Sequence, residues 1–355
     1  MDRFSCRTTV VSGTNALSVL GEEKWERMLL IAEPGTVYGA RIRQAAGYPA
    51  MEQQEVTTPT VKQAVEGSRK IREFHPDLVV ALGDRTVLDC GKAMVCFSRE
   101  PCTLAAVPAA IGSGSEVTGT AILSHNGCRH LFQDPAMYPA MAILDAGLTE
   151  KFSGAAVREG GFELLAAAAE AFAGMNGGCL RDLHAREAFA AAWGALPAAC
   201  AGNIHARQRL QMAGVLAGMA GEGTEPGLCR AMENSLVTLF GISPGKAAAM
   251  LLPAIIGCNA HAAGMRYAEL SRAAGLGGSR EDIGIRNLKS GLVRLRRELG
   301  LPGTLVQAGI DIRAVWNHSR KIVELTLEDP ACRNNPVAVD DFMVRRILEE
   351  ITGRI

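Results

Sequence analysis

A loop rich in glycine and hydroxyl residues at 108–118, Pro-Ala-Ala-Ile-Gly-Ser-Gly-Ser-Glu-Val-Thr, has the composition of a phosphate or ribose site. It follows directly on the apolar run 104–107. Small residues after a strand let backbone N–H groups approach a ligand closely, and glycine tolerates the positive φ values that such turns often need. A second corner lies upstream, where the apolar run 77–82 turns at Gly83 into a helix-like segment ending at Lys92. Two such corners predict a crevice that binds a cofactor.

Neither corner carries a generic nucleotide fingerprint. The chain contains no G-x-G-x-x-G sequence and no Walker loop. Taken alone, the glycines at 112 and 114 are equally typical of an ordinary loop. The strand in front of them and the second corner favour the binding site.

Composition excludes some partners. Lys plus Arg and Asp plus Glu both number 37, so no net charge attracts nucleic acid or anionic lipid. A chain of 355 residues is long enough for two domains, each with its own core. Because aromatic residues are only 5% of the chain, small and aliphatic side chains must fill the interior, which suits closely packed helices.

The cysteines indicate a reducing compartment. All ten are scattered, none forms a C-x-x-C pair, and several lie in apolar runs. The chain begins with a strand-like run rather than an apolar signal core, and charges, Gly or Pro interrupt its apolar stretches before they reach the length of a membrane span. We therefore expect a soluble cytoplasmic protein.

Strand and helix patterns alternate through the first 150 residues. Expected strands are 8–12, 28–32, 55–58, 77–82, 104–107, 120–123, 129–132 and 141–145, and expected helices are 37–46, 59–74 and the segment after Gly83. Asn-Gly at 126–127 predicts a hairpin turn between two of the strands. Strands separated by helices favour a mostly parallel, doubly wound sheet.

After residue 148 the pattern becomes helical. Expected helices are 155–173, 180–201, 204–220, 244–264, 280–299, 310–325 and 338–352, and no strand is expected after Asp145. The sequence thus predicts an α/β plus all-α protein, with a Rossmann-like parallel-sheet domain at 1–149 and an all-helical domain at 150–355. We expect a small ligand to bind in a cleft between these domains.

The two corners resemble signatures of the iron-containing alcohol dehydrogenases. Residues 83–92 are similar to G-G-G-S-x-x-D-x-x-K, and 108–118 to P-T-T-x-G-T-G-S-E-V-T. Segment 142–149 looks like the end of the family's first domain, and 161–172 looks like its G-x-D-A-x-x-H-A-x-E-A-Y helix. The resemblance covers nearly the whole chain. It implies a dehydroquinate-synthase-like fold, dinucleotide binding by the first domain, and assembly into a homo-oligomer such as a homodimer.

The resemblance also implies cofactor-binding positions. They are Glu33, Gly83, Asp84, Arg85, Thr86, Ala109, Ala110, Gly112, Ser113 and Ser115. An acid at Glu33 bonds a ribose 2′-hydroxyl and favours NAD over NADP, although a solvated loop glutamate is an equal alternative. Asp84 and Arg85 replace two glycines that face the pyrophosphate in the family, and a carboxylate there repels phosphate unless Arg85 offsets it. We expect weak NAD binding or loss of the cofactor.

The family's metal ligands, one Asp and three His, are replaced. The matching positions are Glu163, Ala167, Arg230 and Pro244, and a further family histidine is Asn234. One carboxylate without imidazoles does not hold a transition metal tightly, so we expect no metal. None of the seven histidines occupies these positions; His184 and His261 are the ones to check for closeness to the cleft.

Arg230 allows two interpretations. It can form a structural ion pair with Glu163 in a vacated metal site. Alternatively, its guanidinium polarises a substrate carbonyl or grips a substrate carboxylate, with Asn234 as a hydrogen-bond donor. The second interpretation makes Arg230, Asn234 and Glu163 the catalytic residues.

Three functions remain open at this stage. The first is an NAD(P)-dependent oxidoreductase that acts on a small alcohol or aldehyde without bound metal. The second is a non-catalytic homologue with a binding or assembly role. The third is a phosphate-substrate relative, similar to dehydroquinate synthase or glycerol-phosphate dehydrogenase, against which the missing metal ligands count equally. The expected partners are a small molecule and further copies of the chain, with neither nucleic acid nor membrane.

Overall fold

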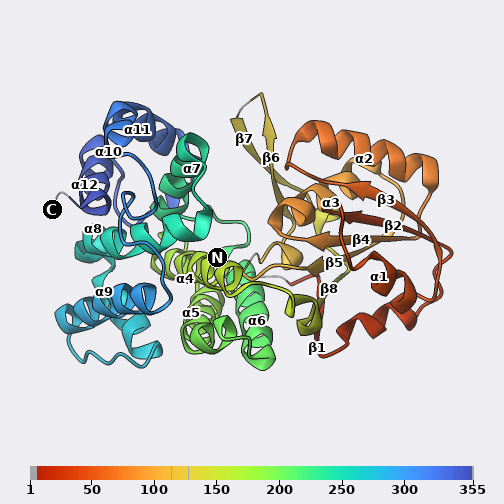
Figure 1. Cartoon of the computed structure of the whole chain (residues 1–355), viewed down its shortest axis with the longest axis horizontal. Helices are drawn as coiled ribbons and strands as arrows, with labels where there is room; N and C mark the ends of the chain where they lie inside the picture. The colour runs from red at the N-terminus through yellow and green to blue at the C-terminus, as the bar shows by residue number, and fades with distance from the viewer. Residues whose placement is uncertain (1–5, 113, 127, 354–355) are drawn as a thin grey trace. The chain divides into compact units, whose positions relative to one another are not determined.

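The structure is a computed structural model that describes residues 6–112, 114–126 and 128–353. The chain divides into two compact units (Figure 1). The first unit runs to Phe152 and also contains Gly202–Gly223, and the second comprises Ser153–Ala201 together with the chain from Thr224 onward. The domain boundary expected between residues 149 and 150 stays a prediction. Residues 202–223, which were expected to belong to the helical domain, group with the N-terminal unit.

A six-stranded parallel sheet forms the centre of the first unit. From edge to edge the strands are β1 (Thr9–Gly13), β8 (Met141–Asp145), β5 (Thr103–Pro108), β4 (Leu78–Gly83), β2 (Arg27–Ala32) and β3 (Ala50–Glu55). This is the doubly wound α/β arrangement that the sequence predicts. The unbroken apolar runs of β4 and β5 arise because central strands of a parallel sheet are covered on both faces.

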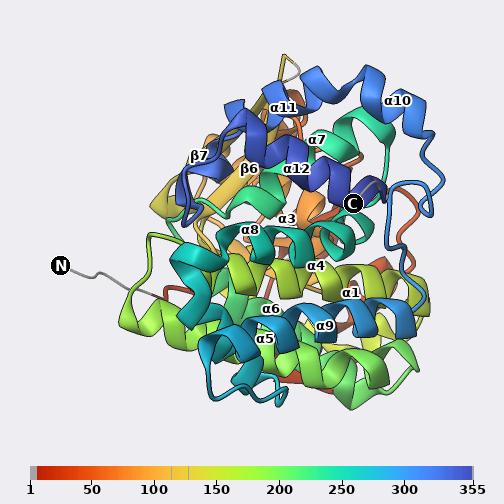
Figure 2. The ribbon, with the colours of Figure 1, turned by 90° about the vertical axis from the view of Figure 1, so that its left-hand side faces the viewer.

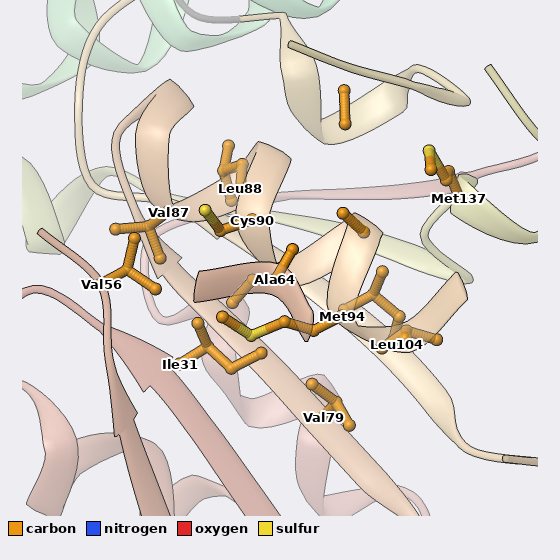
Figure 3. Packing of buried hydrophobic residues seen from close by; sticks show 14 of the residues in the cluster. Ile31, Val56, Ala64, Val79, Val87, Leu88, Cys90, Met94, Leu104 and Met137 are labelled. Carbon is orange, nitrogen blue, oxygen red and sulfur yellow. The ribbon is translucent and has the colours of Figure 1, made fainter. Parts of the chain in front are cut away.

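Alternate residues of each strand supply two separate cores. On one face, Ile31, Val79 and Leu104 pack beneath α2 (Val61–Phe74) and α3 (Arg85–Ser98), with Met94 among them (Figure 3). On the other face, strand residues such as Leu30 and Val80 pack with η1 (Ala16–Gly21) and α1 (Gly39–Ala45). The period-two alternation along each strand therefore determines which side chains belong to which core.

The strand expected at 55–58 is wrong, because the strand in this region ends at Glu55. β3 lies at Ala50–Glu55, where its residues pair in register with β2 from Arg27 to Ala32. β3 is an edge strand of polar composition, Ala-Met-Glu-Gln-Gln-Glu, so it lacks the apolar signal of a buried strand. The β-branched residues just after it gave a stronger local signal than the strand itself.

The predicted hairpin is confirmed. β6 (Thr120–His125) and β7 (Cys128–Gln133) pair antiparallel as a separate two-stranded sheet. Asn126 has a positive φ of 50°, as the first position of a tight Asn-Gly turn needs, while Gly127 lies outside the described residues.

Helix α6 (Ile204–Gly221) packs against the glycine loop of the first unit. An added Cβ on Gly114 would lie 2.7 Å from Cα of Gly218, and one on Gly218 would lie 2.2 Å from the carbonyl oxygen of Gly114. Gly114 also has a positive φ of 65°. These glycines therefore serve close backbone packing between the loop and α6.

The second unit is helical throughout its described residues. Its α-helices are α4 (Gly154–Ala173), α5 (Cys179–Cys200), α7 (Leu228–Phe240), α8 (Pro244–Ala273), α9 (Glu281–Glu298), α10 (Ile312–Asn317), α11 (Ser319–Glu328) and α12 (Asp341–Thr352). The long helix α8 contacts both α4 and α9 (Figure 2). Every element after β8 in the described chain is a helix, as expected.

Three helical expectations need correction. Helix α7 was not expected, and the single helix expected at 310–325 is two helices, α10 and α11, that meet at His318. Contrary to expectation, α8 is long and apolar enough to cross a membrane by length and composition. However, 67% of its apolar window is buried, and it carries Pro253 and a kink at Ala263, so it has the character of a core helix.

The loop–α6 packing predicts a specific stability loss. We expect Gly218→Ala to lower the free energy of unfolding by about 1–3 kcal/mol, because the added methyl group meets backbone that has no rotamer to change. Urea unfolding of the purified protein measures this. Gly221→Ala in the same helix is the control, since its Cβ meets nothing within 4 Å. Equal effects of the two substitutions would contradict the packing argument.

Candidate functional site

A buried lysine supports the glycine loop. The ammonium of Lys92, on α3, donates to the Ser115 hydroxyl at 2.6 Å and to the Ser115 carbonyl at 3.0 Å, and it lies 3.0 Å from Oδ1 of Asp89. It also donates to the Thr118 hydroxyl at 3.1 Å and to the Thr120 carbonyl. Burial lowers the pKa of Lys92, while the carboxylate of Asp89 acts to raise it. This network holds the loop to α3 and to the start of β6.

Asp89 completes the same network. Its Oδ1 accepts from the Ser115 hydroxyl, and its Oδ2 accepts from the backbone N–H of Ile122 at 3.1 Å. Ser115 is only 2% exposed, so its hydroxyl belongs to the internal support of the loop. This differs from the cofactor contact that the family resemblance implies for Ser115, a role that stays a prediction.

At the corner after β4, the side chain of Asp84 occupies backbone N–H donors at the start of α3. Asp84 is the N-cap of α3, and its Oδ1 accepts from the N–H groups of Thr86 at 2.8 Å and Val87 at 3.3 Å. Those N–H groups are the ones that a helix N-terminus offers to a phosphate. Arg85 is the first residue of the helix. As this corner stands, the start of α3 does not fit a bound pyrophosphate.

Gly83 is required by packing as well. An added Cβ there would lie 2.5 Å from Cγ2 of Val87, and the Gly83 carbonyl accepts from the N–H of Ala109 at 2.8 Å. Ala110 continues that loop, and Gly112 has a positive φ of 86°. Ser113 lies outside the described residues. The carboxyl ends of β4 and β5 are thus joined by backbone, which brings both predicted corners together.

Glu33 faces the same corner. It directly follows β2, the neighbour of β4 in the sheet. Desolvation raises the pKa of Glu33, and the nearby carboxylate of Asp84 raises it further. An acid therefore follows each of the neighbouring strands β2 and β4, whereas a phosphate site needs positive charge.

In the second unit, Arg230 is held between two carboxylates. Its Nη2 donates to Oε1 of Glu163 on α4 at 2.9 Å, and its Nη1 donates to Oε1 of Glu233, one turn further along α7. The side chain of Arg230 is 15% exposed, that of Glu163 23% and that of Glu233 2%. Burial acts to lower the pKa of Arg230, but the carboxylates of Glu233 and Glu163 raise it above its ordinary value. The guanidinium stays charged and paired.

The other two ligand positions carry no metal-binding group. Ala167 lies one helical turn after Glu163 on α4, and Pro244 is the first residue of α8. Within the described chain, no three His, Cys, Asp or Glu side chains are grouped to hold a metal ion. Since the carboxylates near Arg230 already pair with its guanidinium, these residues do not fit the family's transition metal.

The remaining candidate residues have structural contacts. Nδ2 of Asn234 donates to Oδ2 of Asp329 at 2.8 Å, which joins α7 to the residue after α11. His184 is half-buried on α5, with Nδ1 2.6 Å from the carbonyl oxygen of Leu180, and His261 is exposed on α8. The catalytic roles proposed from the sequence for Arg230, Asn234 and Glu163 stay predictions.

Two acids of this cluster, Glu170 and Glu233, had no role predicted from the sequence. The carboxylate of Glu170, on α4, accepts from the N–H groups of Cys229 and Arg230 and so caps the start of α7. Removal from water raises the pKa of Glu170 to about 7, although these N–H groups and the charge of Arg230 favour its ionised form. The i, i+3 spacing of Arg230 and Glu233 was a readable signal, but it required α7 to be recognised as a helix.

Comparison with known proteins identifies the family. The model "Iron-containing alcohol dehydrogenase" matches residues 7–146, and "Fe-containing alcohol dehydrogenase family, C-terminal" matches residues 158–352. The 1-propanol dehydrogenase PduQ of Citrobacter freundii is 28% identical over 370 residues, which cover 99% of this chain and 100% of that protein. The chain therefore belongs to the iron-containing alcohol dehydrogenase family.

Solved structures agree with this assignment. The iron-containing alcohol dehydrogenase of Thermococcus thioreducens has a TM-score of 0.89 and 26% identity, with 98% of this chain and 99% of that chain covered. The sulfoacetaldehyde reductase of Bifidobacterium kashiwanohense, solved with NAD+, has a TM-score of 0.88 and 21% identity over all of both chains, which shows the shared fold. The expected fold class and family are confirmed.

Breaking the Arg230 cluster predicts a large loss of stability. We expect Arg230→Ala to cost about 3–5 kcal/mol, because Glu163 and Glu233 would lose the guanidinium that pairs with both of their largely buried charges. Arg186→Ala is the control, since its pair with Glu269 also joins two helices but is 41% and 39% exposed, and should cost about 0–1 kcal/mol. Urea unfolding measures both variants. Comparable losses would show that Arg230 does not neutralise a buried cluster.

The raised pKa of Glu170 predicts that the free energy of unfolding depends on pH. Because its folded-state pKa is raised from 4.5 to about 7, the folded protein holds a proton that the unfolded chain has lost. The contribution is present below pH 4.5 and is lost as the pH rises through about 7. Urea unfolding from pH 4.5 to 8 should show this decline in wild type, and Glu170→Gln should remove it. The exposed Glu187→Gln is the control; the same decline in both variants would contradict the assignment.

Proposed function

We propose that this chain is a non-catalytic member of the iron-containing alcohol dehydrogenase family, with a binding or assembly role. The observation that carries the proposal is the Arg230 cluster, in which a guanidinium bonds Glu163 and Glu233 at positions that resemble the family's metal site. The chain supplies its own cation there, so the carboxylates are not available to a metal ion.

The same cluster disfavours Arg230 as an electrophile. Two carboxylates already neutralise its charge, and a third, Glu170, bonds the backbone N–H of Arg230. A substrate carboxylate would meet net negative charge at this point. A bound metal supplies several kcal/mol of transition-state stabilisation in alcohol oxidation, and a fully paired guanidinium does not replace it.

An assembly role is compatible with the retained fold. The buried network of Lys92 and the glycine packing of α6 tie the glycine loop to the rest of the first unit by contacts within the chain. We infer that the chain acts as a structural subunit, either with copies of itself or with a catalytic relative. Its ten free thiols support a reducing, cytoplasmic location.

A second candidate is a metal-independent, NAD(P)-dependent oxidoreductase that acts on a small alcohol or aldehyde. It is favoured by family membership and by relatives that include a 1-propanol dehydrogenase and an NADPH-dependent butanol dehydrogenase. In this candidate a further N–H of Arg230 would have to reach a substrate oxygen while the guanidinium stays paired with Glu163 and Glu233.

Metal content and turnover test both candidates. We expect the purified protein, incubated anaerobically with Fe²⁺ or Zn²⁺ and then desalted, to retain far less than one metal ion per chain by elemental analysis. We also expect no metal-stimulated reduction of propanal by NADH or NADPH. Stoichiometric metal with stimulated turnover would overturn the proposal, and metal-independent turnover that is lost in Arg230→Lys would establish the second candidate.

A combined variant provides the matched control. Glu163→Asp, Ala167→His, Arg230→His and Pro244→His together place the family's ligand types at the matching positions. We expect this variant to retain metal under conditions where wild type does not. If it also fails while remaining folded by circular dichroism, the correspondence between these positions and the metal site is wrong.

A further inference from the structure

The order of the strands defines where the first unit would take a ligand. The chain passes from β2 outward to β3 on one side, and from β4 to β5 on the other. The connections therefore diverge between β2 and β4. In open parallel sheets the crevice at such a point, outside the carboxyl ends of the strands, is the usual ligand site.

Asp84 occupies the anion-binding part of this crevice. It follows β4 and precedes the 14-residue helix α3, and its carboxylate is 2.8 Å from the N–H of Thr86 and 3.3 Å from that of Val87. A phosphate at the helix start would need these donors. The chain thus places its own anion where the charge of the helix dipole favours one.

The surrounding charges act in the same direction. Glu33 lies at the end of β2, on the other side of the crevice, and interacts electrostatically with Asp84. A diphosphate would bring two further negative charges close to these acids. With Glu33 and Asp84 that makes four negative groups, against which Arg85 adds one positive charge next to Asp84.

We propose that Asp84 is a specificity-determining residue that excludes dinucleotides from the crevice by serving as the internal anion of α3. Its carboxylate acts in two ways: it occupies the two N–H donors, and it repels an approaching phosphate. This inference concerns the first unit alone and does not depend on the Arg230 cluster. The inference goes beyond the metal site, because it assigns weak dinucleotide binding to the side chain of Asp84.

Two substitutions separate the two effects. Asp84→Gly removes both the charge and the cap, and leaves the N–H groups of Thr86 and Val87 open. Asp84→Asn keeps an oxygen that caps the helix but removes the charge. We expect the affinity for NADH to rise at least tenfold in Asp84→Gly and by a smaller factor in Asp84→Asn, measured by calorimetry.

ADP-ribose and a second cap provide the controls. ADP-ribose carries the diphosphate without nicotinamide, so an equal gain in its affinity locates the change at α3. Asp340→Gly removes a similar cap from α12, where the carboxylate accepts from the N–H of Met343 at 2.8 Å, and should leave NADH affinity unchanged. Thermal unfolding of each variant checks that it remains folded.

The outcomes are distinct from those of the metal experiment. Tight NADH binding by wild type, or no gain in a folded Asp84→Gly variant, would overturn the inference. So would an equal gain in Asp340→Gly. Since calorimetry needs neither metal nor turnover, a gain in Asp84→Gly supports the role of Asp84 even if wild type proves to bind metal.

Discussion

The burial of one ammonium group, that of Lys92, constrains the glycine loop and the elements that pack against it. Lys92 is 1% exposed, and such a charge is tolerated only when a counter-charge and several hydrogen-bond acceptors surround it. Asp89 supplies the charge, and the loop around Ser115 supplies acceptors that must curve around the Nζ atom. In the same loop, Gly114 packs against the backbone of Gly218 on α6. A segment remote in sequence thereby becomes part of the N-terminal unit.

At two sites that resemble functional ones, the chain's own side chains take the place of a charged ligand. At the start of α3, a carboxylate takes the place that an anionic ligand would occupy. On α7, a guanidinium pairs with acids that would otherwise attract a cation. In both places the chain itself supplies a charge of the sign that the ligand would carry.

Sequence patterns predicted the elements with strong apolar signals and missed those without. The buried strands β4 and β5 stand close to their expected positions, whereas the polar edge strand β3 was placed too late. Helix α7 went unrecognised because charged and polar residues such as Arg230 and Glu233 interrupt its apolar face, and these are stable there only as an ion pair. Pairing across elements has no local signature.

The sequence by itself determined the family and the α/β-then-helical order, because these depend on residue identity along the chain. It also predicted that Glu163, Ala167, Arg230 and Pro244 stand at the family's ligand positions. Only the tertiary structure decided what the exchanged residues do. It showed that the carboxylate of Asp84 turns back onto its own helix, and that Arg230 lies between acids from two helices. Such contacts depend on distances between groups on separate turns and elements, which packing sets and local sequence does not encode.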